Sequence, residues 1–197
     1  MRPTSQGLEL LLTSAKQSAV DIHEHLDLLR SLASECEHVT EFGVRGANGS
    51  TVALMAGQPE TLVSYDINPG SFIGNPWALN LMTVAGRTRW QPRVGNTLTM
   101  PVIEPTDLLF IDTYHTGNQL QSELVRHADP VANTVRRYLA FHDTVTFGYV
   151  GEDGKPPGLR DAIRWFQKCH AFPVWELMED RKNNNGLVVL KNLRWRG

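Results

Sequence analysis

The chain has 197 residues, a formal net charge of −2 at pH 7 and 41% hydrophobic residues. This size suits a single domain with a real core, and the composition excludes disordered, collagen-like and low-complexity proteins. The small negative charge gives no positive field to hold a polyanion, so we expect no nucleic-acid partner. Two cysteines cannot form a disulfide scaffold, and no apolar run is long enough for an export signal or a membrane span. We therefore expect a cytoplasmic protein with no membrane partner.

The predicted elements begin with helices in residues 1–37, where Ile22, Leu26, Leu29 and Ala33 recur at helical spacing. From residue 38 to 192, short apolar runs alternate with helical patterns. Strands are predicted at 39–44, 62–66, 89–94, 107–112, 137–142, 173–178 and 186–190. Helices are predicted at 50–56, 77–85, 118–127 and 159–166.

This alternation predicts the fold class. Strands that alternate with helices require a mostly parallel sheet with helices on both faces, an α/β doubly wound architecture. The stretch 108–111 is apolar throughout, which is typical of a buried parallel strand. The last two strands are joined by the Asn-rich turn 183–186, which predicts an antiparallel C-terminal hairpin.

A glycine-containing loop from Glu41 to Ser50 joins the first strand to a helix. Glycines let the backbone turn sharply and approach a ligand, and a helix N-terminus offers unpaired N–H groups. The spacing is not that of the dinucleotide motif, and Glu41 would repel a pyrophosphate, so a nicotinamide-dependent oxidoreductase fits less well than a binder of a cationic or zwitterionic ligand. Asp66 ends the next strand, where a ribose-binding acid is expected. We favour nucleoside binding over a plain turn.

Asp112 and Asp143 end two predicted strands that should be neighbours. Parallel neighbours bring their carboxyl ends together, and two carboxylates repel each other unless a positive charge lies between them. A divalent cation, Mg²⁺ or Mn²⁺, would satisfy both; the alternative is a pair of capping acids. His115 lies close by in sequence and could accept a hydroxyl proton, although a lone loop histidine is often only exposed.

A long segment rich in glycine and proline, residues 144–158, follows at the same end of the sheet. Such a loop is usually a lid or a substrate selector, and the alternative is a disordered excursion.

Several of these segments together resemble class I S-adenosylmethionine-dependent methyltransferases. More specifically, they resemble the metal-dependent O-methyltransferase branch that includes macrocin-type sugar methyltransferases and cephalosporin hydroxylase-like proteins. The segments that carry this resemblance are 41–51, 64–66, 110–115 and 141–144. It implies one methyltransferase-like domain over 1–197, with N-terminal helices at 1–37 and a Rossmann-like core at 38–192. The implied core has a seven-stranded sheet that ends in the hairpin.

The resemblance also implies roles for single residues. Glu41 is expected near the methionyl amino group, Asp66 at the ribose and Asn96 near the adenine amine. The remaining implied cofactor contacts are Gly43, Gly46, Gly49, Ser50 and Asp112.

For the metal, the resemblance implies Asp112, Asp143 and His142, the last standing where relatives have an acid or amide. His142 could coordinate, which would favour Mn²⁺, or it could face away from the site. His115 occupies the place of a catalytic histidine in the sugar O-methyltransferases, and with Asp112 it forms the expected catalytic pair.

The predicted function is methyl transfer from S-adenosylmethionine to a hydroxyl of a small-molecule or sugar acceptor, assisted by a divalent metal. The alternative is a non-catalytic S-adenosylmethionine-binding scaffold or regulatory protein that keeps the glycine loop and treats the strand-end acids as structural. The N-terminal helices could cover the domain or pair with a second copy, so a homo-oligomer is open.

Overall fold

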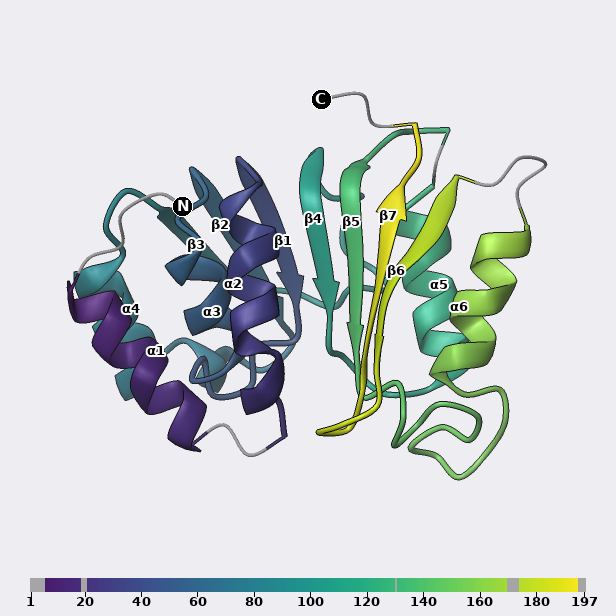
Figure 1. Ribbon diagram of the computed structural model, residues 1–197, viewed down its shortest axis with the longest axis horizontal. Coiled ribbons are helices and arrows are strands. Elements are labelled where there is room, and N and C mark those ends of the chain that lie inside the picture. The colour runs from purple at the N-terminus through teal and green to yellow at the C-terminus, as the bar shows by residue number, and fades with distance from the viewer. Residues whose placement is uncertain (1–5, 19–20, 130, 170–173, 195–197) are drawn as a thin grey trace. The chain divides into compact units, whose positions relative to one another are not determined.

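The computed structural model describes residues 6–18, 21–129, 131–169 and 174–194 (Figure 1). The chain divides into two compact units, residues 1–96 and 97–197, which are described in turn. Among the described helices, none is both long and apolar enough to cross a bilayer.

Unit 1 contains three parallel strands in the order β3-β2-β1. The strands are β1 (His38–Phe42), β2 (Thr61–Asp66) and β3 (Arg89–Val94). The helices are α1 (Gln6–Ser18), α2 (Leu26–Ser34), α3 (Ser50–Ala56) and α4 (Pro76–Val84), with short 3-10 turns η1 (His23–His25) and η2 (Pro69–Ser71). The predicted apolar stripe of Ile22, Leu26, Leu29 and Ala33 is buried. Strand β1 ends before its predicted limit because Gly43 turns the chain with a φ of +84°.

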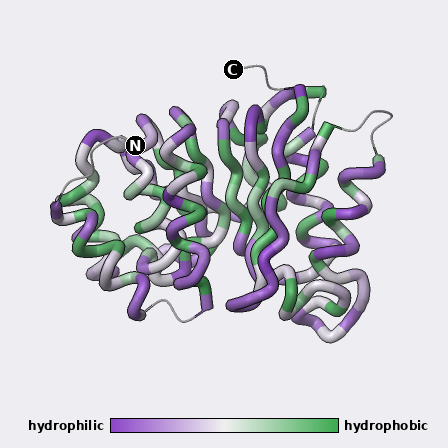
Figure 2. Tube along the Cα trace, in the orientation of Figure 1, coloured by the Kyte–Doolittle hydropathy of each residue, from purple (hydrophilic) through white to green (hydrophobic). Residues whose placement is uncertain are grey.

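Unit 2 contains β4 (Thr106–Ile111), β5 (Val135–His142), β6 (Trp175–Arg181) and β7 (Leu187–Asn192), with α5 (Gly117–His127) and α6 (Leu159–Lys168). Strands β4 and β5 are parallel, and β7 is antiparallel to both β5 and β6. The helices α5 and α6 pack against each other (Figure 1). Every residue of β4 is buried, and Figure 2 shows hydrophobic residues along the middle of β4 and β5.

The hairpin between β6 and β7 closes through residues whose backbones adopt the left-handed region, with φ of 48° at Asn184, 66° at Asn185 and 90° at Gly186. Asn and Gly tolerate this region, which explains the Asn-rich turn. The predicted strand 173–178 starts at Pro173, which lies outside the described residues, and the observed β6 continues to Arg181.

The two units together contribute seven strands, mostly parallel, with the antiparallel C-terminal pair. The predicted α/β class and hairpin are therefore confirmed. The extent of a single domain over 1–197 stays a prediction.

Phe110 lies near the carboxyl end of buried β4, with no exposed surface. Replacing it with alanine removes a large packed side chain directly before the Asp112 strand end, and we expect the free energy of unfolding to fall by about 3–5 kcal/mol. Urea denaturation measures this change. As a control, Val131→Ala removes a side chain that is 87% exposed and should leave the midpoint unchanged. A Phe110→Ala protein as stable as the parent would show that β4 is not the packed core described above.

Candidate active site

The glycine loop of unit 1 wraps around the carboxylate of Asp66. Asp66 Oδ2 accepts hydrogen bonds from the backbone N–H groups of Val44 at 2.9 Å and Arg45 at 2.8 Å. Its Oδ1 accepts from the N–H of Asn68 at 2.8 Å. Burial acts to raise the pKa of Asp66, but these donors hold it below its ordinary value. Asp66 is therefore an ionised acid at the carboxyl end of β2, and it also ties down the loop, a role that the sequence did not indicate.

Glu41 is completely buried in β1 and is held by hydroxyl groups. Its carboxylate accepts from Ser50 Oγ at 2.6 Å, Ser64 Oγ at 2.7 Å and Thr51 Oγ1 at 3.0 Å. The register of β1 on β2 places Ser64 directly beside Glu41, and α3 begins with the other two residues. The buried acid thus joins the start of α3 to the sheet of unit 1. The expected contacts of Glu41 and Ser50 with a cofactor stay predictions.

The other predicted cofactor residues surround the same loop. The Gly46 carbonyl accepts from Asn75 Nδ2 at 3.0 Å, and Gly49 forms the N-cap of α3. Asn96 is exposed and follows Gly95, whose N–H donates to the Asp66 carbonyl at 2.9 Å. The structure therefore gathers the predicted loop, Asp66 and Asn96 at the carboxyl ends of the unit 1 strands. Their contact with a nucleoside stays a prediction.

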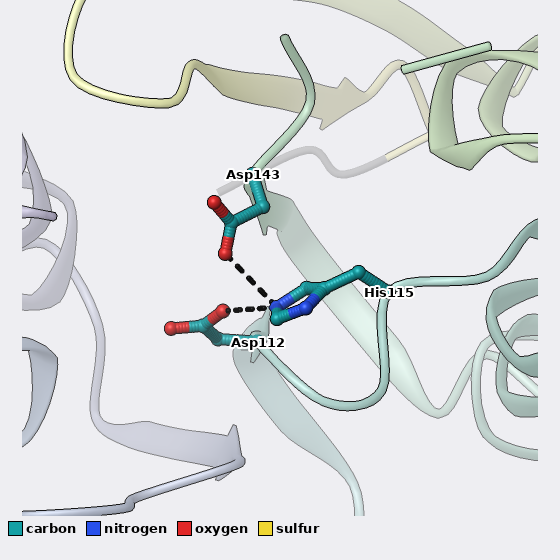
Figure 3. Close-up of side chains that lie close together, drawn as sticks. All are labelled: Asp112, His115 and Asp143. Carbon is teal, nitrogen blue, oxygen red and sulfur yellow. Dashed lines mark hydrogen bonds and ion pairs between the residues drawn. The ribbon is translucent and has the colours of Figure 1, made fainter. Parts of the chain in front are cut away.

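The strand-end acids of unit 2 converge on one imidazole (Figure 3). Asp112 follows β4, and Asp143 follows β5. His115 Nε2 lies 3.2 Å from Asp112 Oδ1 and 2.9 Å from Asp143 Oδ2. Figure 3 shows the His115 ring reaching toward both carboxylates from the loop after β4. The parallel pairing of β4 and β5 explains why these acids meet.

His142, the last residue of β5, lies on the same side as the acids. Its Nδ1 is 3.5 Å from Asp112 Oδ1 and 3.2 Å from Asp143 Oδ2. Asp112 and Asp143 each offer a carboxylate oxygen and His115 offers a ring nitrogen that could ligate a metal, and these three atoms all lie within 4.8 Å of one another. Asp143 Oδ1 is buried and has no hydrogen-bond partner among the residues that the structure describes. These donors fit a divalent cation, and His115 joins His142 as a nitrogen neighbour of the two acids.

The cluster is an ion network. Burial acts to lower the pKa of His115, but hydrogen bonds to Asp112 and Asp143 raise it to about 10. The same carboxylates raise the pKa of His142, and the two histidines in turn hold the pKa of Asp143 far below its ordinary value. At neutral pH His115 is therefore an imidazolium. A general base must be unprotonated, so His115 can accept a proton only after the carboxylates are neutralised by another cation.

The loop 144–158 supplies two neighbours of His115 that the sequence did not indicate. Glu152 Oε2 lies 2.9 Å from His115 Nδ1. The Phe147 ring stacks on the imidazole, with 4.9 Å between the centroids and 9° between the planes. The richness of the loop in glycine suggested a lid, but no sequence pattern paired these residues with His115.

Backbone hydrogen bonds order this loop. The Phe147 N–H donates to the Asp143 carbonyl at 3.0 Å, and the Leu159 N–H donates to the Phe147 carbonyl at 2.8 Å. The Gly117 N–H at the start of α5 donates to the Pro157 carbonyl at 3.0 Å. The segment is a packed loop beside the cluster and not a disordered excursion.

A second buried acid supports the loop that carries Asp112. Glu123 of α5 accepts from Thr97 Oγ1 at 2.6 Å, Gln119 Nε2 at 2.8 Å and Thr113 Oγ1 at 2.9 Å. Burial raises the pKa of Glu123 in spite of these donors. Because Thr113 follows Asp112 directly, this network fixes the chain at the end of β4.

A small pocket opens beside the cluster. Asp112, His115 and His142 line it together with Tyr114 and the apolar side chain of Phe141. The polar groups of the cluster thus lie against an apolar wall.

No family model and no curated protein matches the sequence. Solved structures do match the fold. An O-methyltransferase from Bacillus cereus in complex with SAH has 18% identity and a TM-score of 0.62, covering 98% of this chain and 93% of that chain. The O-methyltransferase TomG from Streptomyces achromogenes, in complex with SAM, has 15% identity and a TM-score of 0.59, covering 96% and 91%. The N-methyltransferase NodS from Bradyrhizobium japonicum has 17% identity and a TM-score of 0.57, covering 86% and 94%.

The chain therefore has the Rossmann-like fold of these methyltransferases, and the predicted resemblance is confirmed at the level of the fold. Because the same fold serves both oxygen and nitrogen acceptors, the acceptor atom has to be argued from the site.

The ion network makes stability depend on pH. The folded-state pKa of His115, about 10, lies above its ordinary value of 6.5, so its contribution is complete below about pH 6.5 and disappears as the pH rises through about 10. In metal-free protein, the difference in unfolding free energy between the parent and His115→Gln should shrink over this range. Chemical denaturation at a series of pH values measures it. A difference that stays constant or grows with pH would contradict the network.

Glu123→Ala should destabilise the protein because it leaves the Thr97, Thr113 and Gln119 side chains without their common acceptor. Each buried polar group left unpaired costs about 1–3 kcal/mol. Thermal or urea unfolding measures the loss, with Glu176→Ala on the exposed face of β6 as the control. Equal stability of the two variants would show that the Glu123 network does not support the site.

Proposed function

We propose that this protein is a cytoplasmic S-adenosylmethionine-dependent O-methyltransferase that methylates a hydroxyl group of a small molecule or sugar. One observation carries the proposal: in a methyltransferase fold, Asp112, Asp143 and His115 converge at the carboxyl ends of two neighbouring parallel strands. Structures of this fold with bound SAM and SAH support the methyl donor. The oligomeric state stays a prediction.

The donor would bind to unit 1. Asp66 is an ionised carboxylate at a strand end, suited to accept hydrogen bonds from ribose hydroxyls. Glu41 adds a buried acid near the start of the glycine loop, which suits the methionyl amino group. Asn96 remains the proposed adenine contact, and the loop positions Gly43, Gly46, Gly49 and Ser50 complete the proposed set in unit 1. Asp112 stays a cofactor contact that only the sequence resemblance implies.

Asp112 and Asp143 would hold a divalent metal, Mg²⁺ or Mn²⁺, with a histidine nitrogen from His142 completing the set. Within the described part of the chain, the buried Asp143 Oδ1 has no hydrogen-bond partner, which supports this proposal. When bound, such a cation supplies Lewis-acid chemistry that lowers the pKa of an acceptor hydroxyl. With a cation held there, Asp112 and Asp143 would not depend on the His115 proton for charge neutralisation.

His115 would act as the general base. In methyl transfer, the acceptor oxygen forms a bond to the methyl carbon while the carbon–sulfur bond breaks, and sulfur keeps the electron pair as S-adenosylhomocysteine forms. The hydroxyl proton passes to His115 Nε2, the ring nitrogen that faces the two acids. Positioning dominates such a displacement, because the attacking oxygen must lie about 3 Å from the carbon and opposite the sulfur.

The direct test incubates the protein with S-adenosylmethionine and each of a panel of hydroxylated acceptors, in the presence of Mg²⁺, Mn²⁺ or EDTA. Mass spectrometry measures the S-adenosylhomocysteine that forms. We expect turnover that depends on the acceptor and on the metal. Calorimetric binding of S-adenosylhomocysteine without any turnover would instead support the scaffold alternative. A folded protein that binds neither donor nor product would refute both.

His115→Ala should lower kcat by about 10²–10⁴-fold, because a positioned base contributes that much to proton transfer. Its affinity for S-adenosylhomocysteine should change little, since His115 is not among the proposed cofactor contacts. Steady-state kinetics and calorimetry measure the two effects separately. If cofactor binding disappeared while the fold persisted, the assigned role would be wrong.

Asp143→Asn should weaken the binding of Mn²⁺ by about tenfold or more, because it removes a charged oxygen ligand. Electron paramagnetic resonance measures the Mn²⁺ affinity. Glu104→Gln, which neutralises an exposed acid elsewhere in unit 2, is the matched control and should bind Mn²⁺ like the parent. Equal Mn²⁺ affinity in the two variants would remove Asp143 from the metal site.

A further inference from the structure

Glu152 and His115 are joined by contacts in both directions. Glu152 Oε2 lies 2.9 Å from His115 Nδ1 and accepts from the His115 backbone N–H at 3.4 Å. In return, the Glu152 backbone N–H donates to the His115 carbonyl at 2.9 Å. The loop 144–158 therefore holds both the backbone and the ring of the histidine.

These contacts fix the direction of the ring. The carboxylate at Nδ1 restricts rotation of the imidazole, and the stacked Phe147 ring restricts its plane. With Nδ1 held on one side, Nε2 points to the Asp112 and Asp143 oxygens at 3.2 and 2.9 Å. Glu152 and Phe147 thus determine the direction in which Nε2 points.

The loop 144–158 packs closely against residues 115–117 because glycines lie at the points of contact. A Cβ atom on Gly151 would lie 3.1 Å from Thr116 Cα and 3.2 Å from the His115 carbonyl oxygen. One on Gly117 would lie 2.5 Å from the Pro157 carbonyl oxygen. Backbone packs on backbone here, and this brings Glu152 within reach of the imidazole.

We propose that Glu152 is a positioning residue for His115, an inference that rests on the proposed function. A carboxylate hydrogen-bonded to one imidazole nitrogen fixes the tautomer and orientation of a histidine that works through the other nitrogen. Glu152 holds a proton on Nδ1, so that Nε2 is the nitrogen that accepts the hydroxyl proton. The loop 144–158 acts as the support of the base.

A purely structural role does not account for the pair. The Glu152 side chain is 44% exposed, and exposed ion pairs contribute little to stability. Removal of this carboxylate should therefore affect the reaction much more than the fold.

The experiment compares Glu152→Ala and Glu152→Gln with Asp153→Asn. Asp153→Asn is the matched control because it removes one carboxylate charge from the same loop and keeps the Oδ1 acceptor for the Lys155 N–H at 3.1 Å. We expect Glu152→Ala to lower kcat by about 10–100-fold, with KM for S-adenosylmethionine within about twofold of the parent. Glu152→Gln retains an acceptor oxygen and should recover part of this loss. Asp153→Asn should stay within about twofold of the parent.

A spectroscopic signature separates positioning from loop integrity. In the parent, the His115 Nδ1 proton should give a slowly exchanging resonance in the proton spectrum, and this resonance should vanish in Glu152→Ala and persist in Asp153→Asn. Unchanged kcat or an unchanged resonance in Glu152→Ala would overturn the proposal, as would an equal loss of kcat in Asp153→Asn. If the parent protein transferred no methyl group at all, the proposed function would fail, while the resonance would still decide whether Glu152 orients His115.

Discussion

The site of unit 2 depends on the repulsion between two aspartates that end neighbouring parallel strands. The pairing of β4 with β5 forces Asp112 and Asp143 together, and neither can remain ionised there without a compensating charge. His115 and His142, whose pKa values are both raised by these carboxylates, supply that charge. Other parts of the unit hold these residues in place. Glu123 fixes the chain after β4 through its hydrogen bond with Thr113, and the loop 144–158 packs against His115.

The same interaction sets a condition on catalysis. A histidine that neutralises two carboxylates is a poor base, because its proton is held by the groups that a metal would bind. If Asp112 and Asp143 held a cation, the carboxylates would no longer need the His115 proton, and Nε2 could accept one. The histidine must then stay in place without its ionic partners. The contact with Glu152 on the opposite side of the ring meets that need, because it does not depend on the two aspartates.

The sequence was sufficient for features that repeat along the chain or follow from strand pairing. The helix at 50–56 and the strand at 89–94 have their predicted limits, since apolar spacing and flanking glycines mark them. The meeting of Asp112 and Asp143 followed from parallel neighbours alone. The partners of the acids were not predictable. The contact of Glu152 with His115, and that of Glu123 with Thr97, join residues from separate loops and helices whose paths no local pattern specifies.

The two units stabilise their strand-end acids by different means, and this difference argues for their roles. Asp66 is held ionised by backbone N–H groups, which are neutral dipoles, so it needs no cation and suits neutral hydroxyl donors such as those of a ribose. Asp112 and Asp143 have charged partners instead, so their natural substitute ligand is a cation. Local electrostatics therefore supports the proposed nucleoside site in unit 1 and the proposed metal site in unit 2, independently of any resemblance in sequence.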